Sequence, residues 1–530
     1  MVRVNRRTLL TTAAGASIGA TPQLVDAGSR FLGFTKSPAQ IYERIDLPTG
    51  AQSGDVTATS AVLWARSAQA SQLLVRLSSN GRVVRSVRGA WTDERHDFTA
   101  KLALTGLAPG REYDATIWFA DYGGRRSRPE QLTFRTAPIH PAPQSFVWSA
   151  DTCGQSWGIN AEVGGFTGYR AMHDVRPDFF IHAGDHIYAD EVVEEAVLES
   201  DGHIWRNTVI EELTRPAQTL RDYRGRYRYV LSDENVRRFH AAVPQVSMWD
   251  DHETANNWYP GWVYPDDRYT VERRCDVLAR HGRQAWQEYM PIANADLTGR
   301  GDDGFASRRI YRKISRGAHL DVFCLDMRSF RDPNTFNNEP EERSLLGRTQ
   351  ADWLIREVSA SRATWKCIVA DLPLSVIGHD KGGEHYEGTG WYDSYANTDD
   401  GAPLGREHEL ARVLTAFKRN GVENFFFLTA DVHYTAAHHY RPERATYGDF
   451  DEFWEFVSGP IQASTFGVKP LDQTFGGEIV FAKGNDGVSQ SPRLGNQFFG
   501  QVEIAASGEL TVNLRNIGGQ VLWTREFHPS

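Results

Sequence analysis

Short apolar runs that end on an acidic residue recur from residue 144 onward, and they restrict the fold more than any other feature of this chain. Phe146–Ala150 is followed by Asp151, and Phe179–Ile181 leads to Asp185. Helical stretches separate these runs, which is typical of an α/β core. Further runs of this kind end at or lead to Asp250, Asp326, Asp371 and Asp431. Because ligands of open α/β sheets gather at the carboxyl ends of strands, these acids predict one shared site.

The residues beside these acids indicate that the site binds metal. A single acid at a strand end can serve as a helix cap or turn former, but repeated acids with His, Cys or Tyr close by form a metal-ligand pattern. Cys153 follows Asp151 by two residues, and Tyr188 follows Asp185 by three. Thiolate and phenolate ligands point to ferric iron, Fe³⁺. The alternatives are an inert buried thiol at Cys153 and an ordinary packing side chain at Tyr188.

Residues 44–137 have a different character. Their alternating apolar runs, such as Ala61–Ala65, are separated by turn signals at roughly ten-residue spacing, which predicts an antiparallel β-sandwich. Leu107–Tyr113 looks like the loop-and-tyrosine corner of fibronectin type III domains. The proline-rich joint Ala137–Pro143 marks a boundary. We therefore expect a multi-domain chain, with an α/β domain over residues 144–530 that closes with alternating C-terminal strands.

The N-terminus indicates export. Arg6 and Arg7 precede a short, weakly apolar stretch, rich in Ala and Gly, that runs to Ala20. This arrangement predicts a twin-arginine signal peptide over residues 1–30 and export by the bacterial twin-arginine machinery; a chance arginine pair on a disordered tail is the alternative. No later segment has about eighteen consecutive apolar residues, so we expect no stable membrane anchor. The predicted location is secreted, periplasmic or in the cell wall.

Composition excludes several other classes of protein. A formal charge of −10 over 530 residues is modest, so nucleic-acid binding by bulk electrostatics is not expected. Four cysteines in a chain of this length exclude a disulfide scaffold. The hydrophobic content of 40% is ample for a large core.

The motifs also occur in a characteristic order: Asp-x-Cys, Gly-Asp-x-x-Tyr, Asp-Asp-His-Glu, then Asp-Val-His. This order resembles the calcineurin-like metallophosphoesterases and, in detail, the alkaline phosphatase D (PhoD-like) family. The resemblance covers the export signal, the sandwich and the α/β domain to about residue 470. It implies an α/β/β/α metallophosphoesterase domain after the fibronectin III-like sandwich. It also implies phosphomonoesterase or phosphodiesterase activity, with in-line attack on phosphorus by a metal-activated hydroxide.

Carried over residue by residue, the resemblance implies two adjacent metal positions. The first would hold Fe³⁺ through Asp151, Cys153, Asp185, Tyr188 and His433. The second would share Asp185 and add Asp251 and Asp431, with Asn257 as a further candidate ligand. Carboxylates here, where related enzymes place an amide and histidines, favour one or two Ca²⁺ ions over Zn²⁺. Asp250 is the alternative to Asp251, but aligning Asp-His-Glu with the usual Asn-His-Glu motif selects Asp251.

Two further residues have implied catalytic roles. His252 would lie beside the second metal and stabilise or protonate the leaving oxygen of the phosphoester substrate. Arg328 resembles a family arginine and would neutralise phosphate charge; a salt-bridged structural arginine is the alternative. The long, Gly-rich and aromatic stretch Ile377–Gly405 is predicted to be a lid or substrate wall.

Two other functions remain open from the sequence. The first is a purple-acid-phosphatase-like enzyme with an Fe–Zn or Fe–Mn centre, although acids stand where those enzymes place Asn and His. The second is an exported binding protein in which the sandwich is active and the α/β domain is an inactive catalytic domain.

Overall fold

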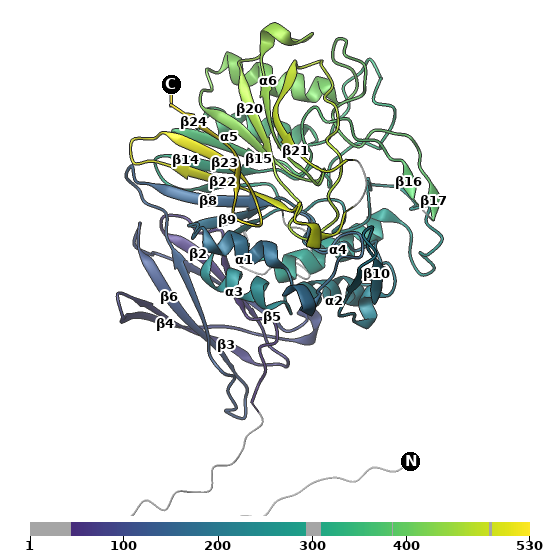
Figure 1. Ribbon diagram of the computed structural model, residues 1–530. Coiled ribbons are helices and arrows are strands. Elements are labelled where there is room, and N and C mark those ends of the chain that lie inside the picture. Colours follow the sequence, from purple (N-terminus) through teal and green to yellow (C-terminus); the bar gives the residue numbers. More distant parts are fainter. Residues whose placement is uncertain (1–43, 293–308, 384, 487–489) are drawn as a thin grey trace, which may run out of the picture. The chain divides into compact units, whose positions relative to one another are not determined.

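Two large mixed β-sheets pack face to face at the centre of the fold (Figure 1). The computed structural model describes residues 44–292, 309–383, 385–486 and 490–530. Within these residues one sheet has nine strands, in the order β24 (Val521–Phe527), β23 (Leu510–Asn516), β22 (Phe498–Ile504), β8 (Gln144–Ser149), β9 (Phe179–His182), β12 (Gln245–Ser247), β1 (Ala51–Gly54), β2 (Ser60–Arg66) and β5 (Thr99–Thr105). The other has seven, in the order β13 (Arg312–Ser315), β14 (Leu320–Cys324), β15 (Trp365–Val369), β18 (Phe425–Thr429), β20 (Phe453–Val457), β19 (Thr435–Tyr440) and β21 (Gly477–Lys483).

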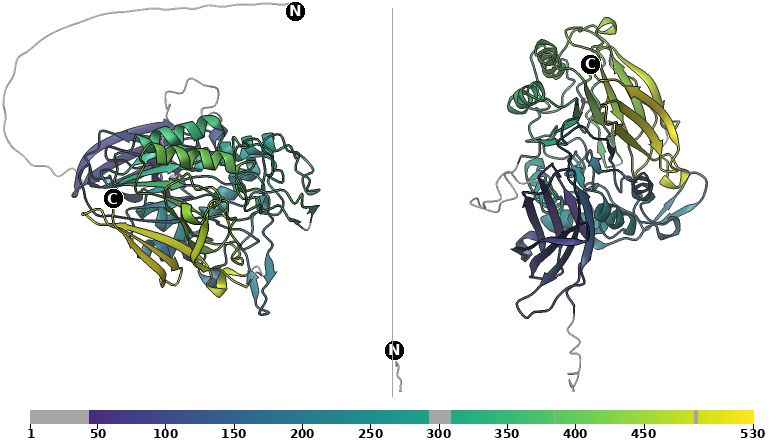
Figure 2. Two further views of the ribbon diagram at one scale, coloured as in Figure 1. Left: turned by 90° about the horizontal axis from the view of Figure 1, so that it is seen from above. Right: turned by 90° about the vertical axis from the view of Figure 1, so that its left-hand side faces the viewer.

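Helices cover the outer faces of both sheets. Successive side chains of a strand point to opposite faces, so Ile181 of β9 packs between the sheets while Phe180 packs against helices. The nine-stranded sheet is covered by α1 (Thr167–Asp174), α2 (Leu220–Val230), α3 (Glu234–Ala242) and α4 (Cys275–Tyr289). The seven-stranded sheet is covered by α5 (Arg348–Ser359) and α6 (Glu407–Arg419), which lie side by side (Figure 2). The predicted α/β/β/α arrangement is confirmed.

The N-terminal sandwich is also confirmed, and it shares a sheet with the α/β domain. A four-stranded sheet, β4 (Arg82–Trp91), β3 (Gln72–Ser79), β6 (Glu112–Ala120) and β7 (Glu130–Arg135), packs on β1, β2 and β5 through one apolar core. The Tyr113 hydroxyl accepts a hydrogen bond of 2.8 Å from the Ala108 amide, which forms the predicted tyrosine corner. Strand β1 pairs in parallel with β12, Gly54 opposite Gln245, so the strand ladder continues from one domain into the other.

Two short hairpins lie outside the main sheets. They are β10 (Ala196–Leu198) with β11 (Ile204–Arg206), and β16 (Gly382–Gly383) with β17 (Tyr386–Glu387). The second lies inside the stretch that was predicted to be a lid or wall.

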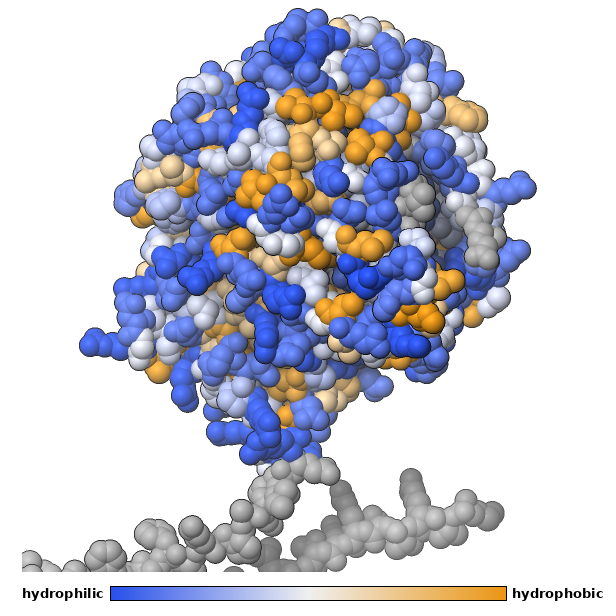
Figure 3. Space-filling model, in the orientation of Figure 1, coloured by the Kyte–Doolittle hydropathy of each residue, from blue (hydrophilic) through white to orange (hydrophobic). Residues whose placement is uncertain are grey.

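The surface and the termini add little to the functional argument. The face in Figure 3 carries hydrophilic side chains interspersed with small apolar patches. In the part of the chain that the structure describes, no helix combines the length and the apolarity needed to cross a membrane. The predicted signal peptide, residues 1–30, lies outside the described residues.

Candidate active site

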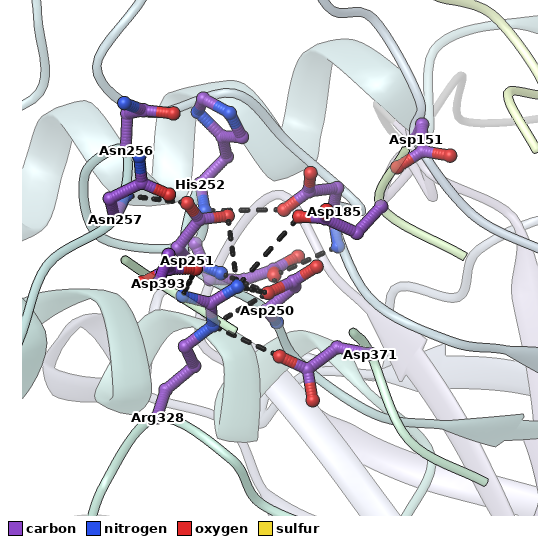
Figure 4. Close-up of polar contacts among 12 residues, drawn as sticks. Asp151, Asp185, Asp250, Asp251, His252, Asn256, Asn257, Arg328, Asp371 and Asp393 are labelled. Carbon is purple, nitrogen blue, oxygen red and sulfur yellow. Dashed lines mark hydrogen bonds and ion pairs between the residues drawn. The ribbon is translucent and has the colours of Figure 1, made fainter. Parts of the chain in front are cut away.

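Strand ends from both sheets bring a set of carboxylates together (Figure 4). Asp151 follows β8, Asp185 follows β9 and Asp251 follows β12, three parallel neighbours in one sheet, while Asp431 follows β18 of the facing sheet. Three of these acids have left-handed backbone angles, with φ of 65° at Asp151, 53° at Asp185 and 63° at Asp431. Such angles cost about 1–3 kcal/mol each and persist only where the surroundings enforce them, which is common at functional sites.

A glycine permits the tight packing of these strand ends. Gly184 has a φ of 132°, and a Cβ atom there would lie 2.5 Å from the Cβ of Asp250. The glycine of the Gly-Asp motif is therefore needed for the close approach of the loops after β9 and β12.

A first cluster joins Asp151, Asp185 and His433, whose ligand atoms lie within 4.8 Å of one another. His433 Nδ1 lies 2.6 Å from the Ser464 carbonyl oxygen, and its Nε2 lies 2.7 Å from the Tyr188 hydroxyl. Because a carbonyl can only accept, Nδ1 carries the proton and Nε2 presents its lone pair to the cluster. Burial lowers the pKa of His433 to about 3, so the ring is neutral, as a metal ligand must be.

Asp151 of this cluster and the nearby Asp251 have carboxylate oxygens without a hydrogen-bond partner among the described residues. Neither side-chain oxygen of Asp151, and not Oδ1 of Asp251, accepts a hydrogen bond from any described residue. Burial, reinforced by neighbouring carboxylates, raises the pKa of both Asp151 and Asp185 well above the usual range. Buried carboxylates crowded in this way are costly unless a cation or proton compensates them. The donor set and its unsatisfied oxygens fit bound metal ions.

Two further groups extend the site. Asp185, Asp251 and His252 form one, and Asp250, Asp251 and Asp431 form the other. Asp250 Oδ1 accepts a hydrogen bond of 2.8 Å from the Asp251 amide. We call these two groups together the second cluster. Asp185 belongs to both clusters, so carboxylate oxygens run continuously from the first cluster to the second.

Arg328 lies behind the second cluster rather than in the cavity (Figure 4). Its side chain is fully enclosed and forms ion pairs with Asp250 at 2.6 Å, Asp371 at 3.0 Å and Asp393 at 2.8 Å. The same guanidinium lies 3.9 Å from Asp251 and 3.8 Å from Asp431. This enclosure favours the salt-bridged alternative for Arg328, whose ion pairs hold the surrounding carboxylates in position.

His252 is held by a residue that the sequence analysis missed. His252 Nδ1 lies 2.6 Å from Asp190 Oδ1, and the ring packs on Tyr188 with centroids 4.1 Å apart. Burial alone would lower the pKa of His252, but the charges of Asp190 and Asp251 outweigh it and raise the pKa well above its usual value. The imidazolium is therefore the favoured form. The one signal in the sequence was that Asp190 follows Tyr188 by two residues.

Glu253 was also missed, although it is the last residue of the Asp-Asp-His-Glu motif. Its buried carboxylate accepts amide hydrogen bonds from Asp185 at 3.0 Å, His186 at 2.5 Å and Asp250 at 2.7 Å. One carboxylate thus ties the loop after β9 to the loop after β12.

The two remaining predicted ligands are Cys153 and Asn257. Among the described residues, the Cys153 thiol is not part of any of the three groups; it is buried, and burial raises its pKa to about 12. The Cys153 amide donates to the Gln462 carbonyl at 2.7 Å. The Asn257 amide donates to Asp251 Oδ2 at 2.6 Å, and Asn257 lines the cavity above the carboxylates.

That cavity has a volume of about 620 Å³, which suits a small ligand. His252, Asp431 and His433 line it, together with residues 377–382 and Lys469. The stretch predicted as a lid or wall does line the cavity.

Comparisons with known proteins agree with this geometry. The PhoD-like phosphatase family matches residues 146–514, and its N-terminal domain matches residues 35–138. Alkaline phosphatase D of Bacillus subtilis (strain 168) is 28% identical over 448 residues, which is 79% of this chain and 69% of that protein.

Solved structures match as well. A structure of PhoD superposes with a TM-score of 0.67 at 21% identity over 89% of this chain and 87% of that one, and so shares the fold. A purple acid phosphatase from yellow lupin (Lupinus luteus) seeds gives a TM-score of 0.49 at 12% identity, over 90% and 73% of the two chains. With the family matched over most of its length, the chain belongs to the PhoD-like phosphatases and is a phosphoric-ester hydrolase of the alkaline phosphatase D type.

Proposed function

We propose that the protein is an exported phosphomonoesterase or phosphodiesterase whose first cluster holds Fe³⁺ and whose second holds Ca²⁺. The observation that carries the proposal is the buried row of carboxylates in which both oxygens of Asp151 and Oδ1 of Asp251 accept no hydrogen bond from the described residues. Ferric iron would be held by Asp151, Cys153, Asp185, Tyr188 and His433. Calcium, as one or two ions, would be held by Asp185, Asp251 and Asp431, with Asn257 alongside.

Ligand chemistry supports this division. The Tyr188 hydroxyl and the Nε2 lone pair of His433 meet at 2.7 Å beside Asp151 and Asp185, so a phenolate and an imidazole are available to one ion. The second cluster offers oxygen donors, which hard cations such as Ca²⁺ prefer. Cys153 stays in the first set on the family resemblance alone.

The chain's own residues have separate tasks in the reaction. Metal ions bound here would polarise the phosphoryl oxygens and lower the pKa of a water molecule. Since Nδ1 of His252 is engaged by Asp190, its Nε2 is the nitrogen left to donate a proton to the leaving oxygen. Arg328 would act as a positioning residue, because its ion pairs with Asp250 and Asp371 hold the carboxylates under the substrate.

Metal analysis and turnover together test the proposal. Protein purified without chelator is expected to contain iron and calcium and to hydrolyse aryl phosphate mono- or diesters with added Ca²⁺. Asp185→Asn, which alters the carboxylate common to both clusters, should lose metal and turnover together. Iron with zinc and no calcium would favour the purple-acid-phosphatase-like alternative. No turnover by metal-replete protein, with affinity for a polymer, would favour the exported binding protein.

Export is a separate part of the proposal. It rests on Arg6 and Arg7 and the short apolar stretch that follows them. Replacement of both arginines by lysine should retain the protein in the cytoplasm of a bacterial host, whereas normal export of that variant would remove the twin-arginine assignment.

A further inference from the structure

The cavity carries basic side chains on the wall formed by the loop after β15 and the segment before β21. His379, Lys381 and Lys469 all line this wall. His379 and Lys381 are exposed to solvent, and Lys469 is half-buried. Two backbone contacts join their segments: Val376 bridges Leu471, and the Ile377 amide donates to the Pro470 carbonyl at 3.4 Å. The three side chains therefore belong to one rim, which we call the basic rim.

The lysines of the basic rim form no ion pair among the described residues, although Asp431 lies within range of the charge of Lys469. Among the described residues, neither Lys381 nor Lys469 has a carboxylate oxygen within the 4.0 Å of an ion pair. The adjacent acid, Asp380, is buried and already accepts hydrogen bonds from the Gly382 amide, the Thr389 amide and hydroxyl, and the Tyr386 hydroxyl. Since lysines normally find solvent or a counter-charge, a pair facing a ligand cavity indicates an anionic ligand group.

The rim is built on an ordered loop. The Asp380 amide donates to the Trp391 carbonyl at 2.9 Å, and the Gly390 amide donates back to the Asp380 carbonyl at 2.9 Å. Strands β16 and β17 close a hairpin just beyond Lys381 (Figure 1). Asn256 Nδ2 also donates to the Tyr386 hydroxyl at 3.4 Å, which links the hairpin to the loop that carries His252. The position of Lys381 is thus set relative to the carboxylate clusters.

The basic rim and the carboxylate clusters line the same cavity, and the charge of Lys469 acts on both Asp431 and His433. This inference rests on the function proposed above, in which the scissile phosphate lies beside His252, Asp431 and His433. With a phosphate there, the cations of the basic rim face the rest of the substrate, either its leaving group or the group that stays on phosphorus. We propose that the basic rim binds a second phosphate group of the substrate, so the preferred substrates are phosphoesters with another phosphate one short linker from the scissile one.

Matched substrates test this assignment. Thymidine 5′-(p-nitrophenyl phosphate) is compared with the same ester that also carries a 3′-phosphate, because both release the same leaving group from the same diester. A glycerol p-nitrophenyl phosphate pair, with and without a terminal phosphate, provides a non-nucleoside version. We expect kcat/KM of the metal-loaded protein to be about tenfold higher for the member with the second phosphate, since several exposed ion pairs add modest increments. Preference in both pairs assigns a general phosphate subsite, and preference in the thymidine pair alone assigns a nucleotide.

The readout for variants is the ratio of kcat/KM within a pair, which cancels losses of folding or metal. The double variant Lys381→Gln/Lys469→Gln should bring the ratio close to one. The single variant Lys469→Arg, which keeps the charge, should retain most of the parent's ratio. Lys418→Gln is the matched control, because Lys418 is on the outer helix α6 and pairs with Asp449, and its ratio should equal that of the parent. The preference should also shrink in 0.5 M salt, as expected of exposed charges.

The outcomes separate this inference from the proposed function. Two results would overturn the assignment of a phosphate subsite to the basic rim and leave the proposed function standing. One is turnover of both members of a pair with a ratio near one in the parent protein, and the other is a ratio that the double variant leaves unchanged. Absence of turnover of all four esters and of the monoester p-nitrophenyl phosphate by metal-loaded protein would overturn both.

Discussion

The contact between Asp190 and His252 allows a sharp prediction about the leaving group. In Asp190→Asn the carboxylate is replaced by an amide of the same shape, so the Asn256 amide can keep its contact of 3.1 Å at this position. What is lost is the charge on the 2.6 Å hydrogen bond to Nδ1. Hydrogen bonds to charged groups contribute about 1.5–3 kcal/mol. That loss corresponds to about a 10- to 150-fold fall in rate, if the imidazolium acts in the transition state.

The fall should depend on the leaving group. An alkoxide needs a proton from His252 as it departs, whereas p-nitrophenolate is stable without one. We therefore expect kcat for an alkyl phosphate to fall by the full factor and kcat for p-nitrophenyl phosphate to fall by less than about threefold. The assay is phosphate release from both esters by the metal-loaded parent and variant, with Asp449→Asn, a substitution of an exposed acid, as control. Equal loss for both esters would refute a proton-donating role of His252 and leave Asp190 only a structural one.

Three other perturbations follow from the structure. Tyr188→Phe should abolish or strongly shift a visible phenolate-to-iron absorption band, and Cys153→Ala should lower iron content; normal colour, iron content and activity in both variants would contradict the ferric site. Arg328→Met leaves Asp250, Asp371 and Asp393 without their counter-charge and should lower the free energy of unfolding by about 3–5 kcal/mol, measured by urea titration of metal-free protein. Arg412→Met, which breaks exposed pairs with Glu342 and Asp352, should cost under about 1 kcal/mol, and a similar cost for the two variants would count against the buried network. Burial lowers the pKa of His240 to about 3, against about 6.5 in the unfolded chain, so only the unfolded state gains this proton between those values and stability falls as pH drops below about 6.5. His240→Phe should reduce that dependence by about 1 kcal/mol per pH unit between pH 6 and pH 5, and an unchanged slope would show that His240 is protonated in the folded protein.

The strand-end acids were visible in the sequence because each follows its own apolar run. Asp151, Asp185 and Asp251 come together since the parallel strands before them end at one edge, a rule that local pattern can use, whereas Asp431 joins them from the facing sheet. Asp190 was not visible, because its contact with His252 depends on how two loops fold over each other. The sequence left the role of Arg328 open for the same reason, because one motif cannot show that five acids from four loops surround it.

The boundary between the domains illustrates the same limit. The proline-rich joint after residue 137 separates the two patterns in the sequence, yet β1 of the first pattern pairs with β12 of the second. Such a pairing joins distant parts of the chain and leaves no local trace in either of them. A composition shift therefore located the sandwich without revealing that its sheet is shared.

The shared sheet has a consequence for how this protein can be cut. A chain beginning at residue 144 would leave β12 with unpaired amides and carbonyls along a free edge, and such edges invite aggregation. It would also strip Arg312 of Asp55, its bidentate partner at 2.8 and 2.9 Å. The sandwich therefore covers an edge of the sheet that carries the active-site strands, and truncation at residue 144 should yield insoluble protein rather than a smaller active hydrolase.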